Sequence, residues 1–234
     1  MSSPGAVASE DPTGRRAIGR VSLLALFVTA LVTAQLTAAK LLAIPLPVAV
    51  PRVGPEILLP GAALAYALTF FASDCYAELY GRRAAQVMVN VAFAMNFVVL
   101  ALVWSTIAAP AQNPEFAATF ESALAPATNI VAGSLLAYLV SQNWDVLVFH
   151  ALRDRTDGAH LWLRNLASTA TSQAIDTVIF VGVAFVVAPT YFGIGDALPT
   201  AIVVSLILGQ YLLKLLIAVA DTPFVYLVVA AVRR

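Results

Sequence analysis

The sequence predicts an all-α, polytopic membrane protein with six transmembrane helices and both termini in the cytosol. Composition is the first observation behind this prediction. Of the 234 residues, 61% are hydrophobic and 11% charged, whereas a soluble domain is about 45–50% apolar and about 25% charged. The mean hydropathy is +0.88. A single soluble core of this length could not bury so much apolar surface, so lipid must be part of the solvent.

The second observation is a set of six apolar runs. Each has at least the ~20 residues that cross a ~30 Å hydrocarbon layer as a helix. Backbone amides in lipid must be paired within the segment, which favours helices, and the period-two alternation of barrel strands is not visible. The first run is too long for a cleaved signal peptide. The runs cover residues 20–44, 57–80, 84–109, 125–151, 164–188 and 198–231.

The two ends of the chain depart from this pattern. Residues 1–19 begin with a small, polar, Pro- and Gly-bearing stretch and are predicted to form a disordered cytosolic tail, which leaves residues 20–234 as the six-helix transmembrane domain. The last run is too long for one straight crossing and contains Pro223, which kinks a helix because proline lacks the amide proton. Both a kinked, tilted helix and a span followed by an interfacial segment fit the sequence.

The distribution of arginine predicts the orientation. Ten of the eleven arginines lie on one side of the six-span model, and Arg52 alone lies on the other. Because positively charged residues are enriched in cytosolic loops, both termini are predicted to be cytosolic. The two remaining cations, Lys40 and Lys214, fall inside predicted spans.

Function is expected at the ionisable residues within the spans, because each costs several kcal/mol unless it is paired or hydrated. Two lysines and five acids give a formal charge of minus three. Protonation of some carboxylates, a bound cation, or hydrogen-bond donors of a ligand would complete the balance. The seven residues are Lys40, Asp74, Glu78, Asp145, Asp176, Lys214 and Asp221.

Two of these acids share a short repeated motif. The segments SQNWDVLVF at 141–149 and SQAIDTVIF at 172–180 both match S-Q-x-x-D-x-x-x-F. In the six-span model the two helices run in opposite directions, so the repeat would place two similar sites antiparallel. Transporters often carry internal repeats with the substrate site at the repeat interface.

Structural roles compete with functional ones for each acid. Asp74 and Glu78 could snorkel to the interface, with Glu78 pairing Arg82 at i+4, although acids at a helix C-terminus oppose the macrodipole. Asp145 could pair with Arg153 or Arg155, and Asp176 with Lys214 or Lys40. Asn96 could join helices by hydrogen bonding. Trp144 fits both an interfacial belt residue and a stacking platform.

Four segments of the chain form an ordered series of motifs. They are SDCYAELYGRR at 73–83, S-Q-x-x-D-V-x-x-F at 141–149, WLRNLASTATSQAIDTVIF at 162–180, and K-x-x-x-x-x-x-D-T-P at 214–223. In this order they resemble the queuosine-precursor transporters, also called the vitamin-uptake-transporter family, over roughly residues 20–232. One departure is Leu166, where the family has a second Asn after Arg-Asn.

The resemblance implies import of a 7-deazaguanine base, such as the nitrile preQ0 or the aminomethyl preQ1, across the inner membrane. A carboxylate can accept the adjacent N1–H and N2–H donors of such a base. The predicted substrate-binding residues are Asp176, Gln173, Ser172, Asp145, Gln142, Asn96, Trp144, Phe180 and Lys214. The predicted gating or proton-coupling residues are Asp74, Glu78, Lys40 and Asp221.

Other classes of function are weighed against this one. A carrier for another nucleobase- or vitamin-like solute or cation would use the same acids, whereas a scaffold or energy-module partner would tolerate their loss. An enzyme is not expected because the sequence has no H-E-x-x-H and no G-x-S-x-G. No cofactor or metal site is predicted, and zero net charge gives no indication of nucleic-acid binding. Gly133 and Ala137 form a small-xxx-small pair that would suit a homodimer.

Overall fold

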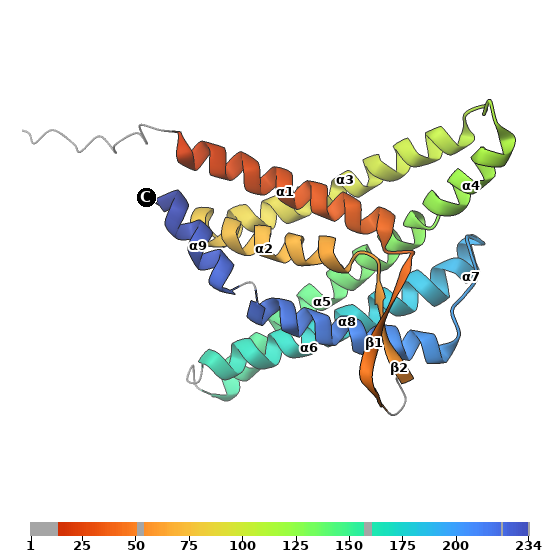
Figure 1. Cartoon of the computed structure of the whole chain (residues 1–234). Helices are drawn as coiled ribbons and strands as arrows, with labels where there is room; N and C mark the ends of the chain where they lie inside the picture. Colours follow the sequence, from red (N-terminus) through yellow and green to blue (C-terminus); the bar gives the residue numbers. More distant parts are fainter. Residues whose placement is uncertain (1–13, 51–53, 157–160, 221, 234) are drawn as a thin grey trace, which may run out of the picture.

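The computed structural model describes residues 14–50, 54–156, 161–220 and 222–233. Over these ranges the chain is mostly helical and contains one β-hairpin, and the long helices run alongside one another (Figure 1). The elements in chain order are α1 (Arg15–Thr37), β1 (Leu41–Val50), β2 (Gly54–Pro60), α2 (Ala63–Tyr80), α3 (Arg82–Ala108), α4 (Pro114–Leu124), α5 (Ala127–Arg155), α6 (Leu161–Gly182), the π-helical turn η1 (Val183–Val187), α7 (Ala188–Phe192), α8 (Thr200–Ala220) and α9 (Thr222–Arg233).

Each of the six predicted runs contains one long helix, namely α1, α2, α3, α5, α6 and α8. The predicted tail is shorter than expected where the structure describes it, since α1 begins at Arg15; residues 1–13 lie outside the described residues. The last run divides at residue 221 into α8 and α9. Residue 221 lies outside the described residues, so both arrangements that the sequence left open stay predictions.

The prediction of helix at residues 41–44 and 57–60 is wrong, because these residues pair as an antiparallel hairpin. Leu41 lies opposite Pro60, Ile44 lies opposite Ile57, and the register is irregular between Pro45 and Val50. Four prolines fall within the two strands. Proline cannot continue a helix, but a two-stranded ribbon has only edge strands, where a missing amide proton is tolerated.

The hairpin packs against α8 at a glycine. A Cβ placed on Gly209 would lie 2.4 Å from the backbone oxygen of Leu58 and 2.7 Å from Cγ2 of Ile57. Any larger residue at this position would push the strand away from the helix. Gln210 and Lys214 follow Gly209 on α8. The close contact at Gly209 therefore also fixes the position of the helix that places these two polar residues inside the bundle.

Two apolar clusters hold the helices together. In the first, Leu23, Phe27 and Leu31 of α1 pack against Cys75 and Tyr76 of α2, and α3 closes the cluster. The second joins α1, α5, α6, η1 and α8. Its buried hydrophobic residues are Ala34, Ala38, Ala62, Ile130, Ala137, Phe180, Val181, Ala184, Phe185 and Leu206.

Gly133 and Ala137, the small-xxx-small pair, pack against other helices of the same chain. A Cβ on Gly133 would lie 2.9 Å from Cβ of Ala184 and 3.0 Å from the backbone oxygen of Phe180. Ala137, one turn along α5, is 1% exposed and belongs to the second cluster. The pair therefore allows α5 to approach α6 and η1 closely, and the homodimer stays a prediction.

Five helical segments of the described chain are long and apolar enough to cross a membrane, one fewer than predicted. α2 is the predicted span that is not among them, because Asp74, Glu78 and three tyrosines make it less apolar. It nevertheless packs against α1, α3, α8 and α9. The five segments are Arg16–Thr37, Arg82–Ala108, Pro114–Arg155, Leu166–Phe192 and Thr200–Ile217.

The elements that carry the arginines meet at one end of the bundle. The start of α1, the α2–α3 junction, the end of α5 and the whole of α9 lie at the left of Figure 1. Arg16 and Arg20, Arg82 and Arg83, and Arg153 and Arg155 belong to these segments. We call this the arginine-rich end; the turn between α3 and α4 lies at the opposite end.

Candidate functional site

A cavity of about 240 Å³ lies between α1, α2, α3, α5, α6 and α8. The connection between β2 and α2 closes part of its wall, through Pro60, Ala62 and Ala63. Most of the lining is apolar, with a few convergent polar side chains, which is the usual composition of a small-molecule site. Its volume is slightly below the ~300–1,000 Å³ of pockets for drug-sized ligands, so it suits a small one.

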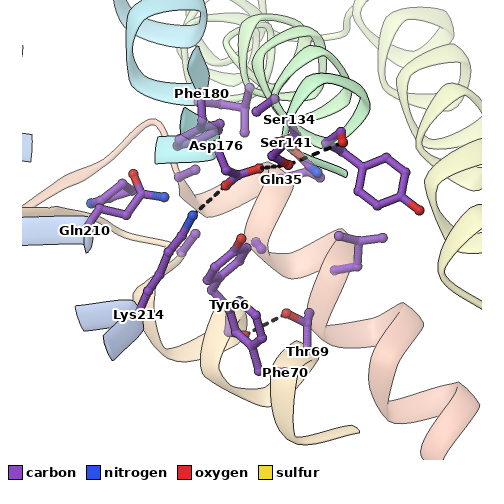
Figure 2. A pocket seen from close by; sticks show the side chains of 18 of the residues that line it. Gln35, Tyr66, Thr69, Phe70, Ser134, Ser141, Asp176, Phe180, Gln210 and Lys214 are labelled. Atoms are coloured by element: carbon purple, nitrogen blue, oxygen red, sulfur yellow. Dashed lines mark hydrogen bonds and ion pairs between the residues drawn. The ribbon is translucent and has the colours of Figure 1, made fainter. Parts of the chain in front are cut away.

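An ion pair lies at the centre of this cavity. Nζ of Lys214 on α8 is 2.5 Å from Oδ2 of Asp176 on α6, and Oγ of Ser141 on α5 donates to Oδ1 at 3.3 Å. Figure 2 shows the two charged side chains pointing toward each other across the cavity. The lysine side chain is 2% exposed and the aspartate 17%. Burial of two charges is costly, and their mutual attraction and hydrogen bonds offset that cost.

The carboxylate of Asp176 retains acceptor capacity. A carboxylate offers about four lone-pair positions, and the described residues that contact it, Lys214 and Ser141, use two. Among the described residues that line this cavity, Asp176 is also the one acid. A ligand with two adjacent N–H donors could therefore bind the aspartate with the lysine still nearby.

Two amide side chains in the same cavity have buried oxygens without a protein partner in the described structure. They belong to Gln173 on α6 and Gln210 on α8. Buried polar atoms are nearly always hydrogen-bonded, because an unpaired one costs about 1–3 kcal/mol. A third amide, of Gln35 on α1, accepts a hydrogen bond from Ser134 at 3.4 Å. The unpaired oxygens therefore indicate that a polar ligand or water completes this site.

Aromatic rings form another part of the lining. Tyr66 and Phe70 on α2 meet edge to face, with ring centroids 4.9 Å apart, and Nζ of Lys214 lies 5.5 Å from the centroid of Tyr66. On the other side, Phe93 of α3 stacks on Tyr138 of α5 at 4.6 Å. The cavity thus combines flat apolar faces with a carboxylate, an ammonium group and amides, a set that fits a planar polar ligand.

The repeated motif forms a reciprocal contact between α5 and α6. Ser141 donates to Asp176, and Ser172 donates to Oδ1 of Asp145 at 3.2 Å. The serine of each S-Q-x-x-D segment thus binds the aspartate of the other, and both serines are buried. The structure therefore supports the sequence repeat as a local twofold arrangement of two antiparallel helices.

Five of the nine predicted substrate-binding residues line the cavity, and four do not. The cavity is lined by Asp176, Gln173, Gln142, Phe180 and Lys214. The other four residues do not line it. Asp145 lies one turn away at a second opening, Ser172 is buried between the helices, Trp144 is exposed and donates from Nε1 to Thr171, and Asn96 is fully buried on α3 with no partner among the described residues for its amide.

The predicted gating residues lie away from the cavity. Asp74 and Glu78 are on the exposed side of α2. Lys40 is exposed in the turn after α1, where its backbone oxygen accepts a hydrogen bond from the amide of Gly61 at 2.6 Å. Asp221 lies outside the described residues. Asp176 pairs with Lys214, one of the two lysines that the sequence offered as partners, whereas Asp145 forms no ion pair with Arg153 or Arg155 in the described structure.

Several cavity residues were not among the predicted set. Gln35 and Gln210 were polar residues inside apolar runs, and Gln210 precedes Lys214 by one helical turn, so this spacing could have identified it. Tyr66, Phe70 and Phe93 gave no such indication, because an aromatic residue in an apolar helix usually faces lipid or the core. No group of three or more His, Cys, Asp or Glu residues that could hold a metal ion occurs among the described residues.

The chain is similar to a known family of transporters and to a relative from Bacillus subtilis. Residues 60–228 match the family model described as "Putative vitamin uptake transporter". A Bacillus subtilis (strain 168) protein described as "Probable queuosine precursor transporter" is 32% identical over 170 residues, which cover 69% of this chain and 67% of that protein. No solved structure matches the chain significantly.

Apolar helices around a cavity that contains a buried ion pair, together with these relatives, define a multi-pass membrane protein of the transporter class. Within that class the chain belongs to the vitamin uptake transporter family, as the family match and the Bacillus subtilis relative show. The family resemblance predicted from the four sequence segments is therefore confirmed.

Proposed function

We propose that this protein imports a 7-deazaguanine base, such as preQ0 or preQ1, across the inner membrane and binds it at Asp176. The carboxylate in the cavity carries the proposal, because it retains about two acceptor positions beside two buried amide oxygens that have no partner among the described residues. The name of the Bacillus subtilis relative supports the same substrate class.

The chemistry of the base matches the lining of the cavity. The adjacent N1–H and N2–H donors face the two open positions of Asp176, and the ring carbonyl accepts from Lys214. Gln173 and Gln210 bind the remaining polar edge. The flat ring system packs against Phe180 or Tyr66.

The proposed topology has six spans and cytosolic termini. α2 is the sixth span: its 18 residues extend about 27 Å, close to the ~30 Å hydrocarbon thickness. The arginine-rich end then faces the cytosol. In this arrangement Asp74 and Glu78 lie near the cytosolic end of α2, where we assign them to gating or proton coupling together with Lys40 and Asp221.

Restoration of tRNA modification tests the proposal. The chain is expressed in cells that cannot make the deazapurine base, the base is supplied at low concentration, and queuosine is measured in tRNA. We expect restored queuosine with the native chain and with Asp154→Asn, an exposed acid near the end of α5, but not with Asp176→Asn.

The outcomes separate the substrate from the site. Absence of queuosine despite normal membrane insertion of the native chain would reject the deazaguanine substrate. Restoration by Asp176→Asn at the native level would reject Asp176 as the binding group. Competition by other nucleobases or vitamins in the same cells would identify a carrier for another solute.

A further inference from the structure

A second cavity opens at the arginine-rich end of the bundle. It has a volume of about 400 Å³ and is lined by Arg82, Asp145, His150 and Thr169, together with Ser168, Val146 and Phe149. Within the described ranges, no residue lines both this cavity and the one that contains Asp176. The two cavities lie in series along α5 and α6, since Gln142 lines the first and Asp145, about one helical turn later, lines the second.

The second cavity has the same kinds of groups as the first. Asp145 provides a carboxylate, Arg82 a guanidinium group that corresponds to the ammonium of Lys214, and Phe149 an aromatic ring. Among described residues, Asp145 receives one side-chain hydrogen bond, from Ser172, so about three of its acceptor positions remain open. A ligand with adjacent N–H donors and a carbonyl would therefore find matching partners in both cavities.

The motif repeat explains why the two sites are alike. Asp145 and Asp176 occupy the same position in the two S-Q-x-x-D segments, and each is bound by the serine of the other segment. The local twofold arrangement thus directs one carboxylate into each cavity. Both serines are buried; Ser141 lines the first cavity, and Ser172 lies in the contact between α5 and α6.

A glycine at the α2–α3 junction places Arg82 beside the second cavity. Gly81 has φ +91°, a conformation that residues with a Cβ rarely adopt. It connects α2 to α3 through a single residue, and Arg82, the first residue of α3, lines the cavity. The neighbouring Arg83 does not line it, which makes this residue a matched control.

We propose that the cavity at Asp145 is a second binding site for the transported base, occupied between the first cavity and the cytosol. The ligand class is a planar heterocycle with two adjacent N–H donors and a carbonyl. This inference rests on the proposed function. In a carrier with a single site, Asp176 and Lys214 alone would bind the base. In the arrangement proposed here, Asp145 and Arg82 bind it at a separate position.

Protection of an introduced cysteine tests the second site directly. The full chain has one cysteine, Cys75, which is buried, so a Cys75→Ala background allows labelling at Thr169→Cys in the second cavity. Maleimide labelling is measured in nanodiscs with and without preQ1, and binding of radiolabelled preQ1 is measured in parallel. At about ten times the Kd, mass action fills roughly nine-tenths of the sites, so labelling should slow about tenfold.

The pattern of variants decides between one site and two. We expect protection at Thr169→Cys to survive Asp176→Asn, to be lost in Asp145→Asn and Arg82→Gln, and to persist in the Arg83→Gln control. A cysteine at exposed Ala151, which does not line the cavity, should show no protection. Persistence of protection with Asp176→Asn would show that the second site fills independently of the first.

Two results would overturn the inference in distinguishable ways. Binding of radiolabelled preQ1 without protection at Thr169→Cys, or protection that Asp145→Asn leaves unchanged, would reject the second site while the proposed substrate remained. Absence of both binding and protection in the otherwise native chain would reject the second site together with the proposed substrate.

Discussion

Neutralising one partner of the Asp176–Lys214 pair should destabilise the protein more than neutralising both. No other acid occurs among the described residues that line the cavity, so Asp176→Asn leaves Lys214, 4% exposed, without a counter-charge from that part of the chain. Loss of one partner of a buried pair costs about 3–5 kcal/mol. For a chain of this size that corresponds to a decrease in Tm on the order of 10 °C.

The double variant Asp176→Asn with Lys214→Gln separates stability from function. Removal of both charges should recover most of the lost Tm, because no unpaired charge remains buried, yet uptake of the base should remain lost. Thermal unfolding in detergent, combined as a double-mutant cycle with the native chain and both single variants, measures the coupling between the two residues. A single variant as stable as the native chain, or additive losses in the double variant, would refute the account of the buried pair.

Three further predictions concern the surroundings of the pair. Gly209→Ala should lower stability by about 1–3 kcal/mol, because the added Cβ would lie 2.4 Å from the backbone oxygen of Leu58. Gly182→Ala should be nearly neutral, because a Cβ added there would have no neighbouring chain segment within 4 Å. Equal melting temperatures of the two variants would contradict the packing of the hairpin on α8. Gln210→Met should leave stability unchanged or raise it, because it removes an unpaired buried oxygen, and should raise the KM for uptake; an unchanged KM would exclude this amide from the site. Tyr66→Phe should retain uptake and Tyr66→Ala should lose it, because the aromatic face forms the contact; equal uptake by the two variants would contradict a stacking role.

The helices of this protein could be predicted because lipid imposes one strong condition on the backbone. Uninterrupted apolar runs located all six long helices. The same reasoning failed at residues 41–44 and 57–60, where the apolar composition of the predicted helices continues into the two strands of a hairpin. The prolines in that segment, such as Pro45 and Pro47, were the available indication, since they exclude a regular helix but are compatible with paired edge strands.

The candidate site could be predicted only in part, because helical spacing does not define how a helix is rotated in the bundle. Asp176 and Lys214 lie on different helices, and their pairing depends on the packing of α6 against α8. Trp144 and Asp145 are adjacent in sequence, yet Trp144 is exposed and Asp145 lines the second cavity. The repeat was visible in the sequence, whereas the exchange of serine partners required the structure.

For Gly133, too, the sequence indicated the kind of contact but not the helix that makes it. A small-xxx-small pattern predicts close helix packing, and the structure confirms close packing of α5 at this residue. The sequence could not specify the partner, which is α6 and η1 of the same chain. Contact within the chain accounts for the pattern without a second copy.

Uptake of a radiolabelled 7-deazaguanine base into proteoliposomes tests the central claim most directly. The purified native chain, Asp176→Asn and the control Asp154→Asn are reconstituted at equal density, and initial rates are measured with and without excess unlabelled base. The account predicts saturable uptake by the native chain and the control, with a loss of at least about tenfold in Asp176→Asn, the rate equivalent of about 1.4 kcal/mol. Equal uptake by all three proteins would contradict the assignment of the cavity at Asp176 as the site of transport.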